Sequence, residues 1–238
     1  MKNLRFKLLV LKSLPYGFLR AIPSARRLLA KPGATEEEKF KLAQEIMDKI
    51  RRKSHTETDV YGRENIPRDD NFIIYSNHQG KYDALGILLA LTKPCSVLWE
   101  KKQASRLLSN EISALLSAVK IDLTDIRSKV RSITEVTDQL TKGRSFLIFP
   151  EGGYEENHNN MQPFFSGCFS CALKSEKPIV PVVLYDSYRA MNGNKLGKVR
   201  TQVHFLPPVY ADEYRNMKKS ELSELIYGLI NKKLNEIA

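Results

Sequence analysis

The sequence is poor in cysteine and histidine. Three cysteines and four histidines occur in 238 residues. The cysteines are Cys95, Cys168 and Cys171, an odd number without a framework spacing, which excludes a disulfide scaffold and favours a reducing compartment. Cys168 and Cys171 form one CxxC pair inside an apolar stretch. Because no second pair accompanies them, we predict that they face the core and that the chain has no such zinc site.

Acidic residues are absent from residues 1–33, which hold eight basic residues. Over residues 1–55, fourteen basic residues stand against five acidic ones, so most of the net charge of +11 lies in this segment. No uncharged apolar run there approaches the roughly 18–20 residues of a membrane span, and Lys12 interrupts any signal-peptide core. The pattern favours a basic amphipathic segment on an anionic membrane surface. A helix packed on the rest of the chain, with its charges solvated, is the alternative.

This charge distribution divides the chain into two parts. Residues 1–55 are expected to form a basic helical hairpin, because a capping box begins at Thr35 and helical apolar spacing follows it. Residues 56–238 are expected to form the main domain, where strand and helix patterns alternate. Such alternation predicts an α/β fold with a largely parallel mixed sheet flanked by helices. Expected strands are 72–76, 95–99, 119–123, 145–149, 179–184 and 200–206, and expected helices are 84–92, 103–117, 127–142, 167–175 and 220–236.

A histidine and an aspartate flank a turn after the first of these strands. His78 ends the predicted strand and Asp83 begins the next helix, with Gly80 between them. A general base needs an acceptor on one ring nitrogen so that the other can take a proton. Asp83 could fold back to supply that acceptor. The alternative is a helix-capping Asp83 beside a hydrogen-bonded His78, and neither residue has the neighbouring ligands of a metal site.

A second group of residues follows the strand at 145–149. Glu151 and Gly152 come directly after Pro150, at the edge where α/β sheets bind ligands, and glycine permits close backbone approach. A solvated turn glutamate is the alternative. The polar stretch 154–162 follows and is expected to be a mobile surface loop. Further on, Pro181 lies inside the strand pattern 179–184, which argues against a central strand.

Taken in order, these blocks resemble the glycerolipid acyltransferase family, whose best-known members are bacterial 1-acylglycerol-3-phosphate acyltransferases. The resemblance runs from about Tyr61 to Pro208 and implies a glycerophosphate acyltransferase-like fold for the main domain. The matching blocks are Asn77-His78 with Asp83, Phe149-Pro150-Glu151-Gly152, Pro163-Phe164 with Gly167, and Ile179-Val180-Pro181-Val182.

The resemblance implies a reaction and roles for these residues. His78 would act as general base on an acceptor hydroxyl, and Asp83 would orient it. Glu151, Gly152 and Gly167 would belong to the acceptor site. The donor would be acyl-CoA or an acyl-acyl carrier protein, with no bound cofactor and no metal. The acceptor would be a lysophospholipid, above all 1-acylglycerol 3-phosphate, giving phosphatidic acid at the cytoplasmic face of the cell membrane, where the protein would be peripheral.

The chain departs from the family pattern at the positions associated with the acceptor phosphate. Arg127 is displaced from the usual arginine position, and Gly153-Tyr154-Glu155 replaces the usual Thr-Arg-Ser. Arg127 and Lys101 are therefore the cations we assign to a phosphate, with solvated surface charges as the alternative. The departures leave open another acceptor: a different lysolipid, glycerol 3-phosphate or an amine. A non-catalytic basic protein that binds membranes or nucleic acid is the alternative of another class, but no nucleic-acid motif is present and none is expected as a partner.

Overall fold

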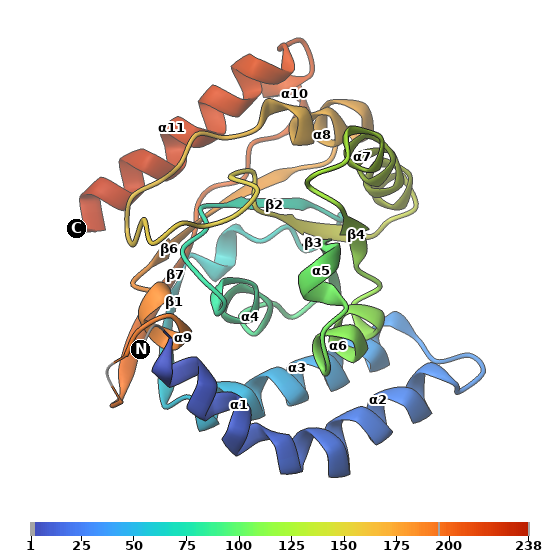
Figure 1. The fold of residues 1–238 in the computed structure, drawn as a ribbon. Coiled ribbons are helices and arrows are strands. Elements are labelled where there is room, and N and C mark those ends of the chain that lie inside the picture. Colours follow the sequence, from blue (N-terminus) through green and yellow to red (C-terminus); the bar gives the residue numbers. More distant parts are fainter. Residues whose placement is uncertain (1–2, 195, 238) are drawn as a thin grey trace.

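The computed structural model describes residues 3–194 and 196–237. A seven-stranded sheet in the order β1-β7-β6-β2-β5-β3-β4 runs through the molecule (Figure 1). Neighbouring strands are parallel, except β6 and β7, which are antiparallel. The prediction of a largely parallel mixed sheet flanked by helices is confirmed.

The strands are β1 (Thr56–Tyr61), β2 (Ile73–Ser76), β3 (Cys95–Glu100), β4 (Val119–Ile121), β5 (Ser145–Ile148), β6 (Ile179–Tyr185) and β7 (Val199–Phe205). The α-helices after β1 are α4 (Asp83–Leu88), α5 (Lys101–Ala104), α6 (Ser109–Leu115), α7 (Ile126–Thr141), α8 (Ser170–Ser175), α9 (Tyr188–Met191), α10 (Ala211–Tyr214) and α11 (Lys219–Ile237). Short 3-10 turns occupy Arg63–Asn65 and Ser166–Phe169.

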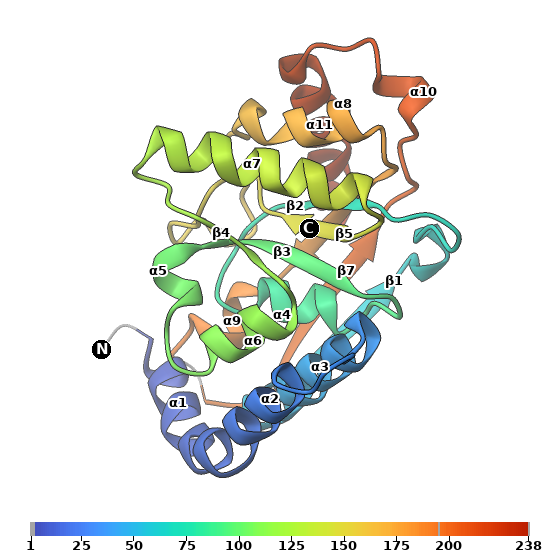
Figure 2. The ribbon, with the colours of Figure 1, turned by 90° about the vertical axis from the view of Figure 1, so that its right-hand side faces the viewer.

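Helices cover both faces of the sheet, and each face has its own core (Figures 1 and 2). Alternate side chains of β2 and of Phe72, the residue before it, serve the two cores. Phe72 and Ile74 join α4 and α6 on one face, while Ile73 and Tyr75 join α7, α8 and α11 on the other. All four are fully buried. A strand buried on both faces reads as a continuous apolar run, and burying each such side chain contributes about 1.5–3 kcal/mol.

The N-terminal segment is a helical hairpin laid against the rest of the molecule. Its first arm runs through α1 (Leu4–Tyr16), a π-helical turn (Gly17–Ala21) and α2 (Ile22–Leu29), and α3 (Glu36–Lys53) returns beside it (Figure 1). Thr35 caps α3 through the predicted capping box with Glu38. One face of the first arm is buried at intervals of four residues: Arg5, Leu9, Ser13, Gly17, Ala21 and Ala25. The hairpin predicted for residues 1–55 is therefore present and packs on the sheet domain.

Three local features differ from the sequence prediction. The edge strand β1 was missed, because its threonines and charges lack a continuous apolar run. The helix expected at 103–117 is two helices, α5 and α6, separated near Leu108, whose φ of 67° no helix accommodates. Pro181 lies in a central strand, opposite Tyr75, and its carbonyl accepts a hydrogen bond from Leu206 N at 2.9 Å.

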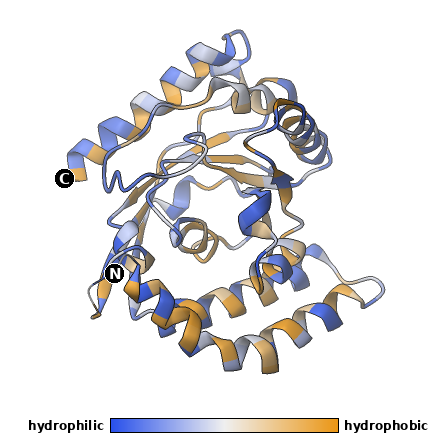
Figure 3. Ribbon diagram, viewed as in Figure 1, coloured by the Kyte–Doolittle hydropathy of each residue, from blue (hydrophilic) through white to orange (hydrophobic). Residues whose placement is uncertain are grey.

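Hydropathy follows the layers of the fold. The strands are predominantly hydrophobic in Figure 3, and hydrophobic stretches also mark the first N-terminal arm. Even so, within residues 3–194 and 196–237 no helix is both long and apolar enough to cross a bilayer.

Candidate active site

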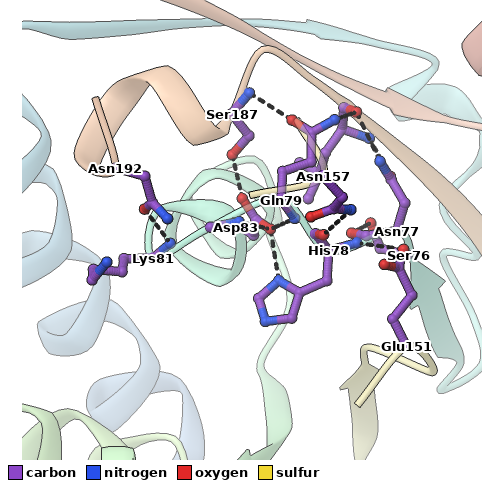
Figure 4. A network of polar contacts seen from close by, with 12 residues as sticks. Ser76, Asn77, His78, Gln79, Lys81, Asp83, Glu151, Asn157, Ser187 and Asn192 are labelled. Carbon is purple, nitrogen blue, oxygen red and sulfur yellow. Dashed lines mark hydrogen bonds and ion pairs between the residues drawn. The ribbon is translucent and has the colours of Figure 1, made fainter. Parts of the chain in front are cut away.

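Three neighbouring strands carry polar residues at their carboxyl ends. β2 lies between β6 and β5 in the sheet. His78 follows β2, Glu151 follows β5 and Ser187 follows β6. Figure 4 shows side chains from these three segments gathered around His78. The carboxyl edge of an α/β sheet, where neighbouring strands diverge in their connections, is the usual place for a ligand crevice.

His78 and Asp83 form the centre of this group. His78 Nδ1 lies 2.7 Å from Asp83 Oδ2 (Figure 4). Asp83 is the first residue of α4, where the helix dipole favours a negative charge. Because Asp83 holds Nδ1, Nε2 is the ring nitrogen left to exchange a proton with a ligand. The structure thus brings these two predicted site residues into direct contact.

The Asp83 carboxylate is fully buried and held by four donors. Besides His78, Gln79 N and Gly80 N donate to its Oδ2 at 2.5 and 2.8 Å. The Ser187 hydroxyl donates to Oδ1 at 2.5 Å. A buried carboxylate is tolerated only when such donors replace its water. The turn that Gly80 closes therefore fixes the position of Asp83.

The His78 ring lies between two aromatic side chains. It stacks on Phe149, with the ring centroids 4.2 Å apart, and meets Tyr154 edge to face at 4.7 Å. Its side chain keeps 18% of its surface exposed. The ring is therefore fixed in orientation, yet a ligand can still reach it.

Two buried amides that flank His78 tie the turn to β6. Asn77 exchanges two hydrogen bonds with the backbone of Leu184, at 2.8 and 3.0 Å. Gln79 donates to Leu184 O at 2.8 Å and accepts from Ser187 N at 2.8 Å. Sequence reasoning did not assign a positioning role to Asn77, Gln79 or Ser187. The available signal was the alternation of Asn77 and Gln79 about His78, which sends both amides to the side opposite the imidazole.

Glu151 contacts the backbone of the site. Its Oε1 accepts from His78 N at 2.9 Å and its Oε2 from Gln162 N at 3.2 Å (Figure 4). Only 4% of the residue is exposed. Burial raises the pKa of this carboxyl to about 7; its two backbone hydrogen bonds oppose the rise and the Asp83 charge adds to it. Since both oxygens already have partners, the direct role visible for Glu151 is to position His78.

The two predicted site glycines have different surroundings. Gly152 has a φ of 71°, which favours glycine, and a Cβ there would lie 3.0 Å from the Phe165 ring. The space beside Gly152 is thus filled by Phe165. Gly167 lies in the 3-10 turn at Ser166–Phe169, where a Cβ would meet nothing within 4 Å.

The two predicted phosphate cations lie on exposed helix starts. Arg127 is in the first turn of α7, where its backbone N donates to Asp125 at 2.9 Å. Lys101 begins α5, and its charge helps lower the pKa of the exposed Asp122 carboxyl, after the hydrogen bonds from Thr124. Within the described part of the chain, no hydrogen bond or ion pair links Arg127 or Lys101 to His78. The phosphate role of these two residues stays a prediction.

The loop at 154–162, expected to be a mobile surface loop, lies over the turn that holds His78. Asn157 Nδ2 donates to His78 O at 3.3 Å, and Asn159 Oδ1 accepts from Gln79 Nε2 at 3.0 Å. His158, an exposed residue of the loop, stacks on Tyr188 with ring centroids 4.4 Å apart. The loop therefore contacts the site in two ways. Asn157 and Asn159 bind His78 O and the Gln79 side chain, and Tyr154 contacts the His78 ring.

Among residues 3–194 and 196–237, no group of three or more histidine, cysteine, aspartate or glutamate side chains could hold a metal ion. The acid–base pair at the carboxyl edge of β2 is thus the chemically distinctive feature of the site.

Curated proteins with similar sequences share one activity in their names. The chain is 29% identical to sheep 1-acyl-sn-glycerol-3-phosphate acyltransferase alpha over 155 residues, which cover 63% of this chain and 53% of that protein. It is 27% identical to the 1-acyl-sn-glycerol-3-phosphate acyltransferase of Borreliella burgdorferi over 75% of this chain and 72% of that one. The Escherichia coli enzyme of that name is 25% identical over 79% and 74%. The chain spans about half the length of the mammalian relatives it matches.

A solved structure and a family model agree with these matches. The crystal structure of the 1-acyl-sn-glycerophosphate acyltransferase PlsC from Thermotoga maritima has a TM-score of 0.80 at 20% identity, covering 99% of this chain and 95% of that one, and it shares the fold. The model of the acyltransferase family matches residues 57–185, which include His78, Asp83 and Glu151. This chain belongs to the acyltransferase family.

Proposed function

We propose that the protein transfers a fatty acyl group from an acyl thioester to the free hydroxyl of 1-acylglycerol 3-phosphate, giving phosphatidic acid. The observation that carries the proposal is the His78–Asp83 pair, with Nδ1 bound to a buried carboxylate and the ring still accessible. Family membership and the activity named in the relatives support the choice of acyl transfer.

His78 Nε2 takes the proton of the acceptor hydroxyl as its oxygen attacks the thioester carbonyl carbon. The new C–O bond forms, the C–S bond breaks, and the proton taken by His78 passes to the departing sulfur. The products are the ester and a free thiol, so no oxidant, metal or enzyme nucleophile is needed. This is the base-and-orienter part of a hydrolase triad, in which the substrate supplies the nucleophile.

Asp83 fixes the tautomer of His78 and stabilises the imidazolium that forms during the transfer. Glu151 holds the backbone N of His78, so it acts as a positioning residue. Fixing the base in this way pre-organises the site, and positioning of this kind contributes several kcal/mol to barrier reduction. The donor is acyl-CoA or an acyl-acyl carrier protein.

The exposed face of the first N-terminal arm supports docking on a membrane surface. Leu11, Phe18 and Leu19 are 63%, 55% and 75% exposed. They lie away from the buried face of the arm, among exposed basic residues such as Lys12 and Arg20. Apolar residues bordered by cations suit an anionic leaflet, the surface in which both lipid substrate and lipid product reside. We place the protein there as a peripheral protein on the cytoplasmic face.

An acceptor panel tests the proposed reaction. Purified protein with one acyl-CoA would be offered 1-acylglycerol 3-phosphate, 1-acylglycerol-3-phosphocholine, glycerol 3-phosphate and a long-chain amine, and the products would be identified by mass spectrometry. The proposal predicts phosphatidic acid as the main product. Preferential acylation of another acceptor would replace the proposed substrate. The panel would be repeated with an acyl-acyl carrier protein, and the absence of any transfer from both donors would contradict the activity.

A further inference from the structure

A lysine lies beside the catalytic pair and takes no part in the hydrogen bonds of that pair. Lys81 belongs to the same turn as His78 and Asp83, and its backbone N donates to Asn192 Oδ1 at 3.2 Å. Its side chain points away from Asp83, on the side of His78 opposite Glu151 (Figure 4). The ammonium lies 5.2 Å from the centre of the Phe6 ring of α1 and 5.7 Å from that of Tyr154.

Tyr154 links this lysine to the base. Its ring contacts both the His78 ring and the Lys81 ammonium, and its hydroxyl is hydrogen-bonded to the Asn192 side chain. A ligand bound at the His78 ring would therefore lie within reach of the Lys81 ammonium. In the family pattern an arginine follows the Glu-Gly-Thr sequence at the position of Tyr154, so this tyrosine is part of the altered segment.

The charge of a second cation, Arg106, acts on Lys81. Arg106 lies in the loop between α5 and α6, on the side of the molecule that carries the N-terminal arm (Figure 2). Partial burial lowers the pKa of Lys81, and the charge of Arg106 lowers it further. Among residues 3–194 and 196–237, neither side chain forms an ion pair or hydrogen bond with a carboxylate, although fifteen other ion pairs are distributed over the molecule. Two cations whose charges act on each other and that have no carboxylate partner are the arrangement expected of an anion site.

We infer that Lys81 and Arg106 form the site for the phosphate group of the acceptor, in place of the cations that the relatives' pattern has elsewhere. The inference rests on the proposed function and names the residues that select its acceptor. Two cations on adjacent segments can bind a phosphate monoester by charge-assisted hydrogen bonds, with the planar guanidinium supplying a bidentate contact.

The chemistry of the two substrates decides which phosphate occupies the site. In 1-acylglycerol 3-phosphate, the reacting hydroxyl and the phosphorus are separated by only two carbons and one oxygen. In coenzyme A, the nearest phosphate lies a full pantetheine arm from the thioester. Because Tyr154 places the Lys81 ammonium one ring away from His78, the acceptor phosphate fits the site and the donor phosphates do not.

The first test measures binding without turnover. Glycerol 3-phosphate would be titrated into wild-type protein and into the Lys81→Met, Lys81→Arg and Arg106→Gln variants, followed by calorimetry or NMR. Methionine keeps the alkyl packing against Phe6 and removes the charge, whereas arginine keeps the charge. We expect about 10- to 100-fold weaker binding in Lys81→Met and Arg106→Gln, and binding close to wild type in Lys81→Arg.

The matched controls are Lys142→Gln and Arg131→Gln, exposed cations on and just after α7. Both should bind like wild type. Equal binding by Lys81→Met and wild-type protein, or no binding of glycerol 3-phosphate by wild-type protein, would overturn the inference whatever the enzyme assay shows.

The second test separates acceptor from donor. For Lys81→Met we expect the KM for 1-acylglycerol 3-phosphate to rise about 10- to 100-fold, with the KM for acyl-CoA and the rate with phosphate-free 1-acylglycerol unchanged. A rise in the KM for acyl-CoA alone would assign the site to the donor and overturn the inference. Equal losses with both acceptors would show a structural role only. If wild-type protein acylates none of these acceptors, the proposed function fails, and the binding test still judges the anion site.

Discussion

His78 is held at its backbone, at one ring nitrogen and on one ring face, by three different residues. Glu151 accepts from its backbone N, Asp83 binds Nδ1, and Phe149 stacks on the ring. A base that is already oriented needs no reorganisation when the acceptor hydroxyl arrives. Holding His78 in this orientation therefore uses two acidic residues, Asp83 after β2 and Glu151 after β5.

Glu151 makes the stability of the fold depend on pH. Its pKa in the folded protein is raised to about 7, above the ordinary glutamate value, so the folded state keeps a proton that the unfolded chain has already released. The contribution of Glu151 to the free energy of unfolding should therefore be largest below about pH 4.5. It should fall by on the order of 3 kcal/mol as the pH rises from about 4.5 to 7.

The Glu151→Gln variant removes this titration. Urea unfolding of wild type and variant across that pH range should give a stability difference that shifts in favour of the variant as the pH rises. Glu155→Gln, an exposed neighbour, is the control and should show no such shift. A pH-independent difference between wild type and Glu151→Gln would contradict the role of Glu151 burial.

At the scale of elements, the turn after β2 is part of the sheet through side chains. Asn77 pairs with the backbone N and O of Leu184 much as a strand residue would, and it is 1% exposed. The pairing extends the contact of β2 with β6 beyond the last strand residue, Ser76. The turn that carries the proposed base is thus anchored to β6.

Removing this anchor should cost stability. Asn77→Ala leaves the Leu184 N–H without a partner and loses two buried hydrogen bonds, so we expect the free energy of unfolding to fall by roughly 2–4 kcal/mol. Chemical denaturation measures the loss. Asn110→Ala, at an exposed position of α6, should change stability by less than about 0.5 kcal/mol; a similarly small effect for Asn77→Ala would contradict the anchoring role.

The sequence predicted those elements whose apolar pattern is strong. The central strands β2, β5 and β6 are apolar except for Ser76 and Ser145. The turns that follow β2 and β5 in the sequence carry His78, Asp83 and Glu151, which the sequence therefore places at one edge of the sheet. Edge strand β1 escaped because four of its six residues are polar, and its place in the sheet is fixed by pairing with β7. The proposed phosphate role of Lys81 escaped because nothing in its local sequence indicates that α1 packs beside the turn that carries His78.

At the scale of the whole molecule, basic charge and exposed apolar side chains coincide on the N-terminal arm. Since the buried residues of this arm include Arg5 and Leu9, the arm belongs to the fold, and its outer face is available for another contact. Arg5 donates to Ala190 O at 2.7 Å, so the arm is also joined to α9, the helix that follows Ser187.

Membrane binding should depend on this outer face. In the Leu11→Ser, Phe18→Ser, Leu19→Ser triple variant, we expect at least about 10-fold weaker co-sedimentation with anionic vesicles, because the burial of three apolar side chains is lost. Wild-type binding should weaken as salt rises. The substitutions replace exposed residues, so the free energy of unfolding should stay near the wild-type value.

The matched control is Ile126→Ser with Val130→Ser, two residues of α7 that are 76% and 64% exposed. This pair should leave vesicle binding unchanged. An equal loss in both variants, or wild-type binding that ignores lipid charge, would contradict docking through the N-terminal arm.

The central claim is that His78 is the base for acyl transfer, and a single comparison tests it most directly. The kcat for acyl transfer to 1-acylglycerol 3-phosphate would be measured for wild type, His78→Asn and His55→Asn, each checked for folding by circular dichroism. His55 is an exposed histidine with a φ of 51°, which asparagine tolerates. The account predicts a loss of at least about 100-fold in kcat for His78→Asn and none for His55→Asn. A folded His78→Asn protein that retains most of the wild-type kcat would contradict it.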